Sequence, residues 1–211
     1  MTAAFTIILP HKRNPGNDAA LRICLEMLMA NTRHDFILLM DAAVNSPLYP
    51  RVNALVEQTM TDLFVYWASD MFASPGWDEP MLARVTPETI VTNTVVEPGV
   101  ISMHGGNHKM DFGRRPETFN RAAFEGWCNE GGHVAGGEGW YAPYMMHRDC
   151  FLDMGGLDLN IDQGLEFGGA DMALFARWKA NGNRVVRAPG SWAYHLQRYS
   201  DEGEQQDGKR L

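Results

Sequence analysis

The sequence predicts an α/β fold in which helices flank a mostly parallel central sheet. Three short apolar runs, at 5–10, 36–40 and 63–67, are rich in β-forming residues. Between them lie two segments whose apolar residues recur at helical spacing. This βαβαβ alternation implies right-handed crossovers and a ligand crevice at the carboxyl ends of the strands.

The first half of the chain supplies these elements in order. The run FTIILP (5–10) stops at a proline and has the pattern of a strand buried on both faces. The helix at 19–31 has Asn17 or Asp18 available as its N-cap. The strand at 36–40 ends at Asp41, the segment 49–60 predicts a second helix, and the strand at 63–67 ends near Asp70.

The second half is less regular. A short helix at 78–85 and a fourth strand at 88–96 precede a Gly-rich stretch that runs to about residue 140. A long, weakly structured stretch inside a domain is usually functional or mobile. The remaining predictions are a strand within 139–148, a helical turn and Gly-Gly corner in 150–158, a helix at 170–182 that stops at Asn181-Gly182, and a strand at 184–189.

Composition restricts the classes of protein that remain. The 211 residues are 45% hydrophobic and 21% charged, which predicts one globular domain (5–199) and a polar, flexible tail (200–211). The net charge of -8 argues against a nucleic-acid partner. Three unclustered cysteines indicate a reducing compartment, and no apolar stretch approaches the ~20 residues of a membrane span. We therefore expect a soluble, cytoplasmic protein.

Six segments spread over Phe5 to His195 share a further pattern. They are FTIILPHKRN, HDFILLMDA, RVN, SDMFASPGW, YMMHRDCFLDMGGLD and FGGADMALFARWKANGNRVVRAPGSWAYH. In order and spacing they resemble the GT-A nucleotide-sugar glycosyltransferases, especially glycosyltransferase family 2. The resemblance implies a single GT-A (Rossmann-like) domain and a metal-dependent enzyme that uses a nucleotide sugar.

The resemblance implies a metal site at Asp70 and His195. A divalent cation neutralises the diphosphate of the donor as it leaves, and Mg²⁺ typically binds through one or two carboxylates plus phosphates. An imidazole ligand shifts the choice toward Mn²⁺, so the expected cofactor is Mn²⁺ or Mg²⁺. The structural alternatives are a turn or helix cap before Pro75 for Asp70 and a packed surface histidine for His195.

Nucleotide contacts are expected along the same edge of the sheet. A carboxylate at Asp41 can accept the imide N–H of uracil, which would make the donor a UDP-sugar; an ordinary Asx turn is the alternative. The first loop offers backbone and basic side chains, although a solvated basic loop would look the same. The full set of predicted nucleotide-binding residues is Pro10, His11, Arg13, Asp41, Arg51, Asn53 and Ser69.

Asp171 is the predicted general base. A carboxylate opposite the leaving diphosphate can take the proton of an acceptor hydroxyl, and inversion at the anomeric carbon follows. Because Asp171 stands where a helix should begin, helix capping is the alternative role. Glu166 is the second candidate base or an acceptor-binding acid. Weaker candidates for sugar contacts are His133, Gly139 and Trp140.

Two departures from the family pattern leave other functions open. Ser69-Asp70 and Ala170-Asp171 each carry one acid where the family often has two. The leading hypothesis is an inverting transfer of a hexose or N-acetylhexosamine from a UDP-sugar to a hydroxyl acceptor, either a glycan or a small molecule. The alternatives are a degenerate, non-catalytic nucleotide-sugar-binding domain and a nucleotidyltransferase.

Overall fold

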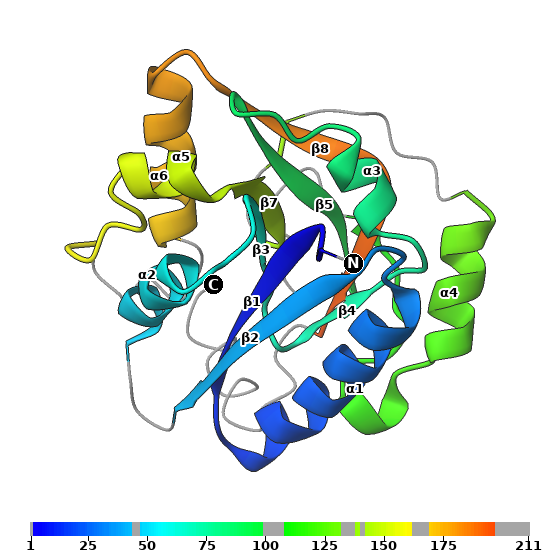
Figure 1. Ribbon diagram of the computed structural model, residues 1–211. Helices are drawn as coiled ribbons and strands as arrows, with labels where there is room; N and C mark the ends of the chain where they lie inside the picture. Colours follow the sequence, from blue (N-terminus) through cyan, green and yellow to red (C-terminus); the bar gives the residue numbers. More distant parts are fainter. Residues whose placement is uncertain are drawn as a thin grey trace, which may run out of the picture.

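A mixed sheet runs through the middle of the protein, and helices cover both of its faces (Figure 1). The computed structural model describes residues 2–43, 47–98, 108–131, 138–139, 142–161 and 169–196. In these ranges the sheet has eight strands. They are β1 (Phe5–Lys12), β2 (Phe36–Ala43), β3 (Leu63–Tyr66), β4 (Met71–Ala73), β5 (Thr89–Glu97), β6 (His108–Lys109), β7 (Tyr144–His147) and β8 (Arg184–His195).

The helices alternate with the strands from β1 to β3, as the periodicity predicts, and less regularly after that. They are α1 (Pro15–Asn31), α2 (Leu48–Glu57), α3 (Asp78–Leu82), α4 (Arg121–Asn129), α5 (Arg148–Asp153) and α6 (Gly169–Ala180), with a 3₁₀ turn, η1, at Pro116–Thr118. Within the described ranges, none of them has the length and apolar character needed to cross a membrane.

The α/β class is confirmed, and the sheet is mixed: six of its eight strands run in one direction, and β4 and β7 run in the opposite direction. The strand order is β2-β1-β3-β7-β5-β8-β4, with β6 beside β5. β1 pairs in parallel with β2 and β3, as expected for two successive crossovers. β7 then inserts between β3 and β5 and runs antiparallel to both, and β4 lies antiparallel to β8. Apolar runs alone do not encode strand direction, which is why the sequence did not predict this.

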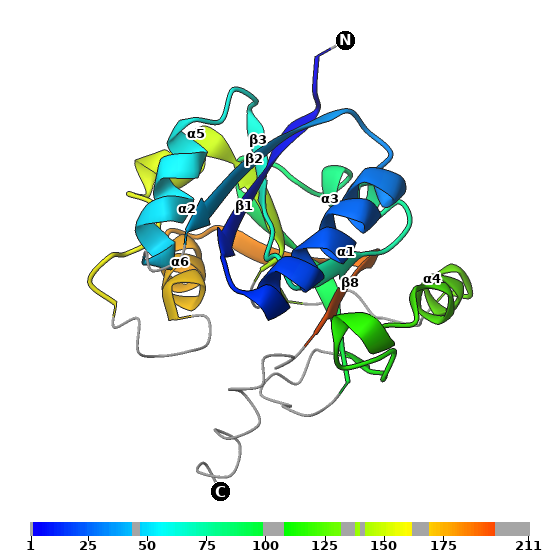
Figure 2. The same ribbon diagram turned by 90° about the horizontal axis from the view of Figure 1, so that it is seen from below.

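Two hydrophobic cores lie on opposite faces of the sheet. Side chains alternate along a strand, so Ile7 of β1 belongs to one core and Ile8 to the other. The first core includes buried residues of α1, α3 and α4, and the second includes residues of α2, α5 and α6. Figure 2 shows α1 and α4 on one side of the sheet and α2, α5 and α6 on the other. All of the apolar side chains from Phe5 to Leu9 are fully buried, as predicted.

Several boundaries differ from the sequence prediction. α1 begins at Pro15, because Asn14 rather than Asn17 or Asp18 is its N-cap; the Asn14 side chain accepts the N–H of Asn17 at 2.8 Å. β8 continues past Pro189 through Gly190, whose φ of 84° suits a glycine. The predicted helix stop at Gly182 is confirmed by its φ of 83°. The predicted tail, 200–211, lies outside the described residues.

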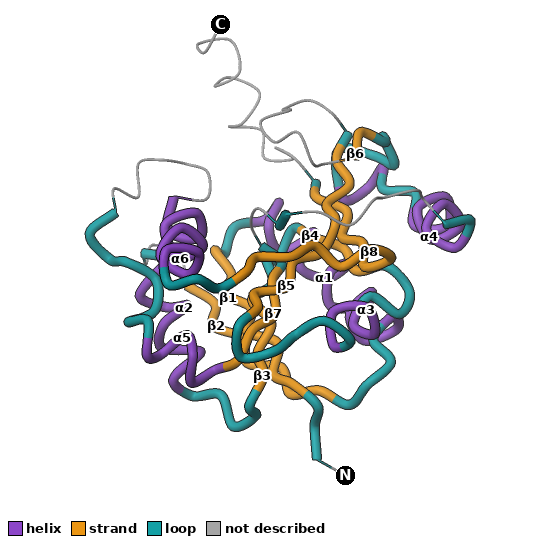
Figure 3. The backbone as a smooth tube through the Cα atoms, turned by 90° about the horizontal axis from the view of Figure 1, so that it is seen from above, coloured by secondary structure: helices purple, strands orange, loops and turns teal. Residues whose placement is uncertain are grey.

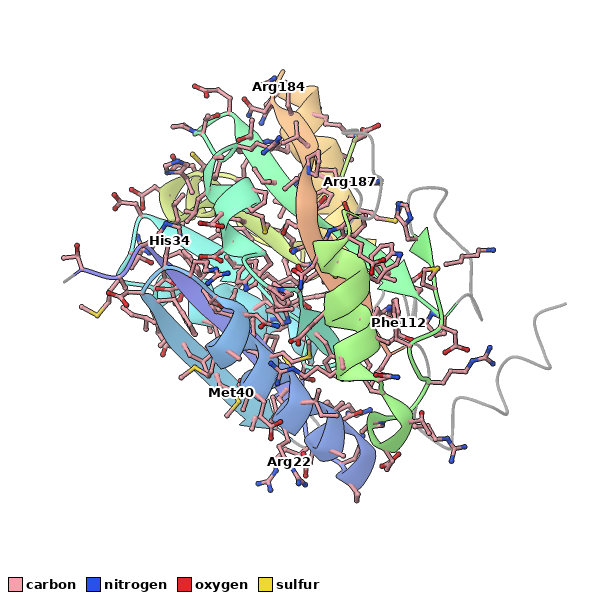
Figure 4. The ribbon with its side chains drawn as sticks, turned by 90° about the vertical axis from the view of Figure 1, so that its right-hand side faces the viewer. Arg22, His34, Met40, Phe112, Arg184 and Arg187 are labelled. Atoms are coloured by element: carbon pink, nitrogen blue, oxygen red, sulfur yellow. The ribbon has the colours of Figure 1, made fainter. Side chains whose placement is uncertain are left out.

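The described part of the Gly-rich stretch includes two elements at one end of the sheet. β6 and α4 stand there, away from α2, α5 and α6 (Figure 3). Phe112 attaches this segment to the sheet, since its ring lies 5.6 Å from the rings of both Phe124 and Tyr194 (Figure 4). The sequence showed no clean periodicity here, because these elements are short and pack through scattered aromatic residues.

Candidate active site

Strand pairing brings Asp70 and His195 together. Asp70 lies in the turn between β3 and β4, and His195 is the last residue of β8. The antiparallel register of β4 and β8 places His195 opposite Met71, and the backbone N–H of Leu196 donates to the carbonyl of Asp70 at 3.1 Å. As a result, Asp70 Oδ2 and His195 Nε2 lie 3.6 Å apart.

Glu97 forms a hydrogen bond with the ring nitrogen of His195 that does not face Asp70, and sequence reasoning missed this residue. It ends β5, which runs parallel to β8, and its side chain is almost fully buried. His195 Nδ1 lies 3.1 Å from Glu97 Oε1, so Nδ1–H donates to this carboxylate and Nε2 faces Asp70. The available signal was an acid at the end of a strand, the same feature that singled out Asp41 and Asp70.

Asp70 and His195 shift each other's pKa values, and Glu97 also shifts the pKa of His195. Burial by itself would lower the pKa of His195, but its interactions with Asp70 and Glu97 raise that pKa to about 10. Burial works to raise the pKa of Asp70, yet the hydrogen-bonding and charge effects of His195 leave it below its usual value. The site therefore pairs an imidazolium with carboxylates, and a cation that binds His195 must displace its proton.

The donor set fits a divalent cation held jointly with a ligand. A metal-binding histidine usually donates its second ring N–H to a carboxylate, as His195 does to Glu97. Over the described ranges, no group of three or more His, Cys, Asp and Glu side chains is arranged to hold a metal ion. Asp70 and His195 could supply two donors to such a cation, and pyrophosphate oxygens and water would supply the rest.

Arg51 joins the carboxyl ends of β1 and β2. Its buried guanidinium donates from Nε to Asp41 Oδ2 at 2.6 Å and from Nη2 to the carbonyl of His11 at 3.0 Å. Nη2 also donates to the carbonyl of Asp41. Because Asp41 keeps 43% of its side chain exposed, its carboxylate can reach a ligand while it pairs with Arg51.

The first loop reaches the same edge of the sheet. Pro10 is buried in β1 opposite Asp41, and Arg13 is exposed just beyond the strand. His11 is buried and contacts Ser69, the residue before Asp70, at 3.1 Å. Pro10, His11, Asp41 and Ser69 therefore belong to one region of the fold, and their contacts with a nucleotide remain predictions.

The remaining predicted residues differ in where they lie. The side-chain amide of Asn53 donates from Nδ2 to the backbone carbonyl of Leu157 at 3.0 Å, and its Oδ1 accepts the backbone N–H of Leu157 at 2.9 Å. These two hydrogen bonds attach α2 to the Gly-Gly corner. Gly139 is buried, and a Cβ there would lie 2.4 Å from Thr92 Oγ1. Their ligand-binding roles stay predictions. Three other candidates lie outside the described residues: His133, Trp140 and Glu166.

Asp171 is a buried acid in the first turn of α6. Only 7% of its side chain is exposed, and its Oδ1 has no hydrogen-bond partner among the described residues. Burial raises the pKa of Asp171 to about 7, although a hydrogen bond from the backbone of Ala142 acts in the opposite direction. A carboxyl group with this pKa can accept a proton near neutral pH.

Tyr66, in β3, is affected by the charges of both acids, and sequence reasoning assigned it only to a buried strand. Burial raises its pKa well above the usual value, and the charges of Asp171 and then Asp70 raise it further. Tyr144, opposite Tyr66 in the register of β3 and β7, is affected by burial and by Asp171 in the same way. The charge of Asp171 thus affects both tyrosines, whereas that of Asp70 affects Tyr66.

Comparison with known proteins defines the class of fold. No family model matches the sequence, and no curated protein matches it significantly. Two solved structures of GT-A-type glycosyltransferases are similar to it at 10% sequence identity, which establishes the fold alone. The chain therefore has a GT-A glycosyltransferase fold.

The two similar structures both contain a nucleotide or nucleotide sugar. One is GalNAc-T7 with UDP, GalNAc and Mn²⁺, with a TM-score of 0.58 over 92% of this chain and 44% of that one. The other is S. aureus TarS 1–349 in complex with UDP-GlcNAc, with a TM-score of 0.59 over 95% of this chain and 60% of that one. The chain thus spans about half the length of the chains it resembles.

Proposed function

We propose that this protein is an inverting, metal-dependent glycosyltransferase that moves a sugar from a UDP-sugar to a hydroxyl acceptor. The observation that carries the proposal is the pairing of Asp70 with His195 at the ligand edge of a GT-A fold, with Glu97 behind the histidine. The presence of UDP or UDP-GlcNAc in the two similar structures supports the same donor class. A hexose or an N-acetylhexosamine is the proposed sugar.

Asp70 and His195 would hold the metal ion and so orient the diphosphate. Mn²⁺ or Mg²⁺, when bound, neutralises the charge that develops on the leaving diphosphate. Glu97 keeps Nε2 of His195 directed at Asp70. Asp41, positioned by Arg51, accepts the imide N–H of uracil and so favours UDP.

Asp171 would remove the proton of the acceptor hydroxyl. Its burial excludes water from the carboxyl group and raises its pKa to about 7. An acid with an ordinary pKa would be a much weaker base, so burial improves proton transfer at neutral pH. Attack from the side opposite the diphosphate inverts the anomeric carbon.

A donor-release assay tests the proposal. Free UDP is measured from a panel of UDP-sugars with Mn²⁺ and with EDTA, with and without sugar acceptors. We expect metal-dependent release that Asp70→Asn abolishes and that Asp171→Asn lowers by about 10²- to 10⁴-fold. Asp149→Asn is the matched control, because this variant has the same acid-to-amide change at a side chain that is 85% exposed.

A second candidate function is a non-catalytic nucleotide-sugar-binding domain. Ser69 and Ala170 favour this candidate, because the family that the chain resembles often has acids at these two positions. Binding of a UDP-sugar without release from any donor would support this candidate and contradict the enzyme.

A further inference from the structure

Three side chains from separate segments form a hydrogen-bonded chain next to the proposed metal site. His11, at the end of β1, has its Nε2 2.7 Å from Asp18 Oδ1, in the first turn of α1. Its Nδ1 lies 3.1 Å from Ser69 Oγ, in the turn that also carries Asp70. His11 is 1% exposed, whereas Asp18 is 45% exposed. Both ring nitrogens of this buried histidine are therefore engaged.

The direction of each hydrogen bond follows from the chemistry of the groups. A carboxylate only accepts, so Nε2–H of His11 must donate to Asp18. When the ring carries one proton, that proton is therefore on Nε2 and Nδ1 is left as the acceptor, whereas a doubly protonated ring would also donate from Nδ1. In the singly protonated ring, the hydroxyl of Ser69 donates its proton to Nδ1, and the Ser69 oxygen can then only accept hydrogen bonds from other partners.

We propose that His11 carries one ring proton, on Nε2, and that Asp18 is a positioning residue that acts through His11 to make Ser69 an acceptor-only oxygen beside Asp70. Such an oxygen can accept from a ribose hydroxyl or contact the divalent cation, but it cannot donate to a phosphate. The identity of this ligand rests on the proposed function, whereas the hydrogen-bond pattern does not.

This arrangement gives Ser69 the property that a second acid would otherwise supply. A carboxylate at this position would present oxygens that only accept. The chain has its acid at Asp18 instead, and Asp18 fixes the hydrogen-bonding direction of Ser69 through the buried ring of His11. Ser69 is therefore a specificity residue whose hydrogen-bonding direction is set two side chains away.

A merely structural role for Asp18 is the competing explanation, because the pair also ties α1 to β1. The Asp18→Asn variant distinguishes this structural role from the proposed positioning role. An asparagine can still hydrogen-bond to Nε2, but its amide offers either an acceptor or a donor, so it no longer imposes one tautomer on His11. Asp149→Asn, at an exposed position of α5, is the control for the change of charge.

The first measurement reads the tautomer directly, without any ligand. The ¹⁵N resonances of the His11 ring are recorded at pH 8 and assigned with His11→Gln. We expect Nδ1 to be unprotonated in the wild-type protein and in Asp149→Asn, and both tautomers to appear in Asp18→Asn. A proton on Nδ1 in the wild-type protein would overturn the proposal.

The second measurement is a double-mutant cycle on binding. UDP with Mn²⁺ is titrated into the wild type, Asp18→Asn, Ser69→Ala and the double variant, and thermal melting confirms that each is folded. We expect each single variant to bind about three- to tenfold more weakly, and the double variant to bind no more weakly than Ser69→Ala. Additive losses, or no loss in Ser69→Ala, would show that Asp18 does not act through Ser69.

Two further titrations distinguish the partner of Ser69. Weaker binding of Mn²⁺ alone by Ser69→Ala identifies the cation. A loss for UDP that disappears with a deoxyribose analogue identifies a ribose hydroxyl. If the wild-type protein binds neither UDP nor Mn²⁺, the proposed function fails, and the ¹⁵N measurement still decides whether Asp18 controls His11.

Discussion

Replacing Asp171 with asparagine should strongly lower the rate of sugar transfer and, at the same time, stabilise the fold above neutral pH. Asp171 is 7% exposed, and burial raises its pKa from 3.8 to about 7. Its ionised form is thus disfavoured in the folded protein relative to the unfolded chain. Asparagine has nearly the same shape and no charge, so it removes this penalty together with the proposed base.

The size of the effect follows from the pKa difference. The folded-state pKa is the higher one, so the contribution of Asp171 to stability is complete below pH 3.8 and is lost as the pH rises to about 7. A shift of about three units corresponds to roughly 4 kcal/mol. The asparagine variant should therefore be more stable than the wild type by up to roughly 4 kcal/mol at pH 8, and the two should converge at about pH 4.

Urea unfolding at several values between pH 4 and pH 8 measures this difference, with Asp149→Asn as the control for charge. Loss of the general base should also lower the transfer rate by about 10²- to 10⁴-fold. A variant that is less stable than the wild type at pH 8 would refute the reasoning. It would mean that Asp171 is ionised in the folded state and stabilised by a partner.

Three further predictions concern the same region. The pH profile of kcat/KM should rise with a midpoint near 7, because Asp171 must lose its proton to act as a base; a flat profile between pH 6 and pH 8 would contradict its role. Glu97→Gln should weaken Mn²⁺ affinity in the presence of UDP by about 10- to 100-fold in calorimetry, since Glu97 orients His195; unchanged affinity would exclude that function. Gly139→Ala should cost about 1–3 kcal/mol in urea unfolding, because the new Cβ would lie 2.4 Å from Thr92 Oγ1, and Thr92→Ala should restore part of the loss.

Local patterns predicted the elements that depend on nearby residues. The apolar runs located β1, β2 and β3, and the helical spacing located α1, α2 and α6, because side-chain periodicity reports which faces are buried. The same patterns missed β4 and α4. β4 has three residues beside a Pro-Gly corner, and in α4 only Phe124 is fully buried, so neither carries enough periodicity to be recognised.

The sequence by itself determined that acids lie near the carboxyl ends of strands, at Asp41 and Asp70, and that an α/β fold places such ends at one edge. Only the tertiary structure decided which side chains meet there. The β4–β8 register places His195 at Asp70, and the parallel pairing of β5 with β8 places Glu97 at His195. Strand direction and register depend on contacts between distant segments, and a shift of one residue would turn each side chain to the other face. The site therefore depends on pairing that no local pattern records.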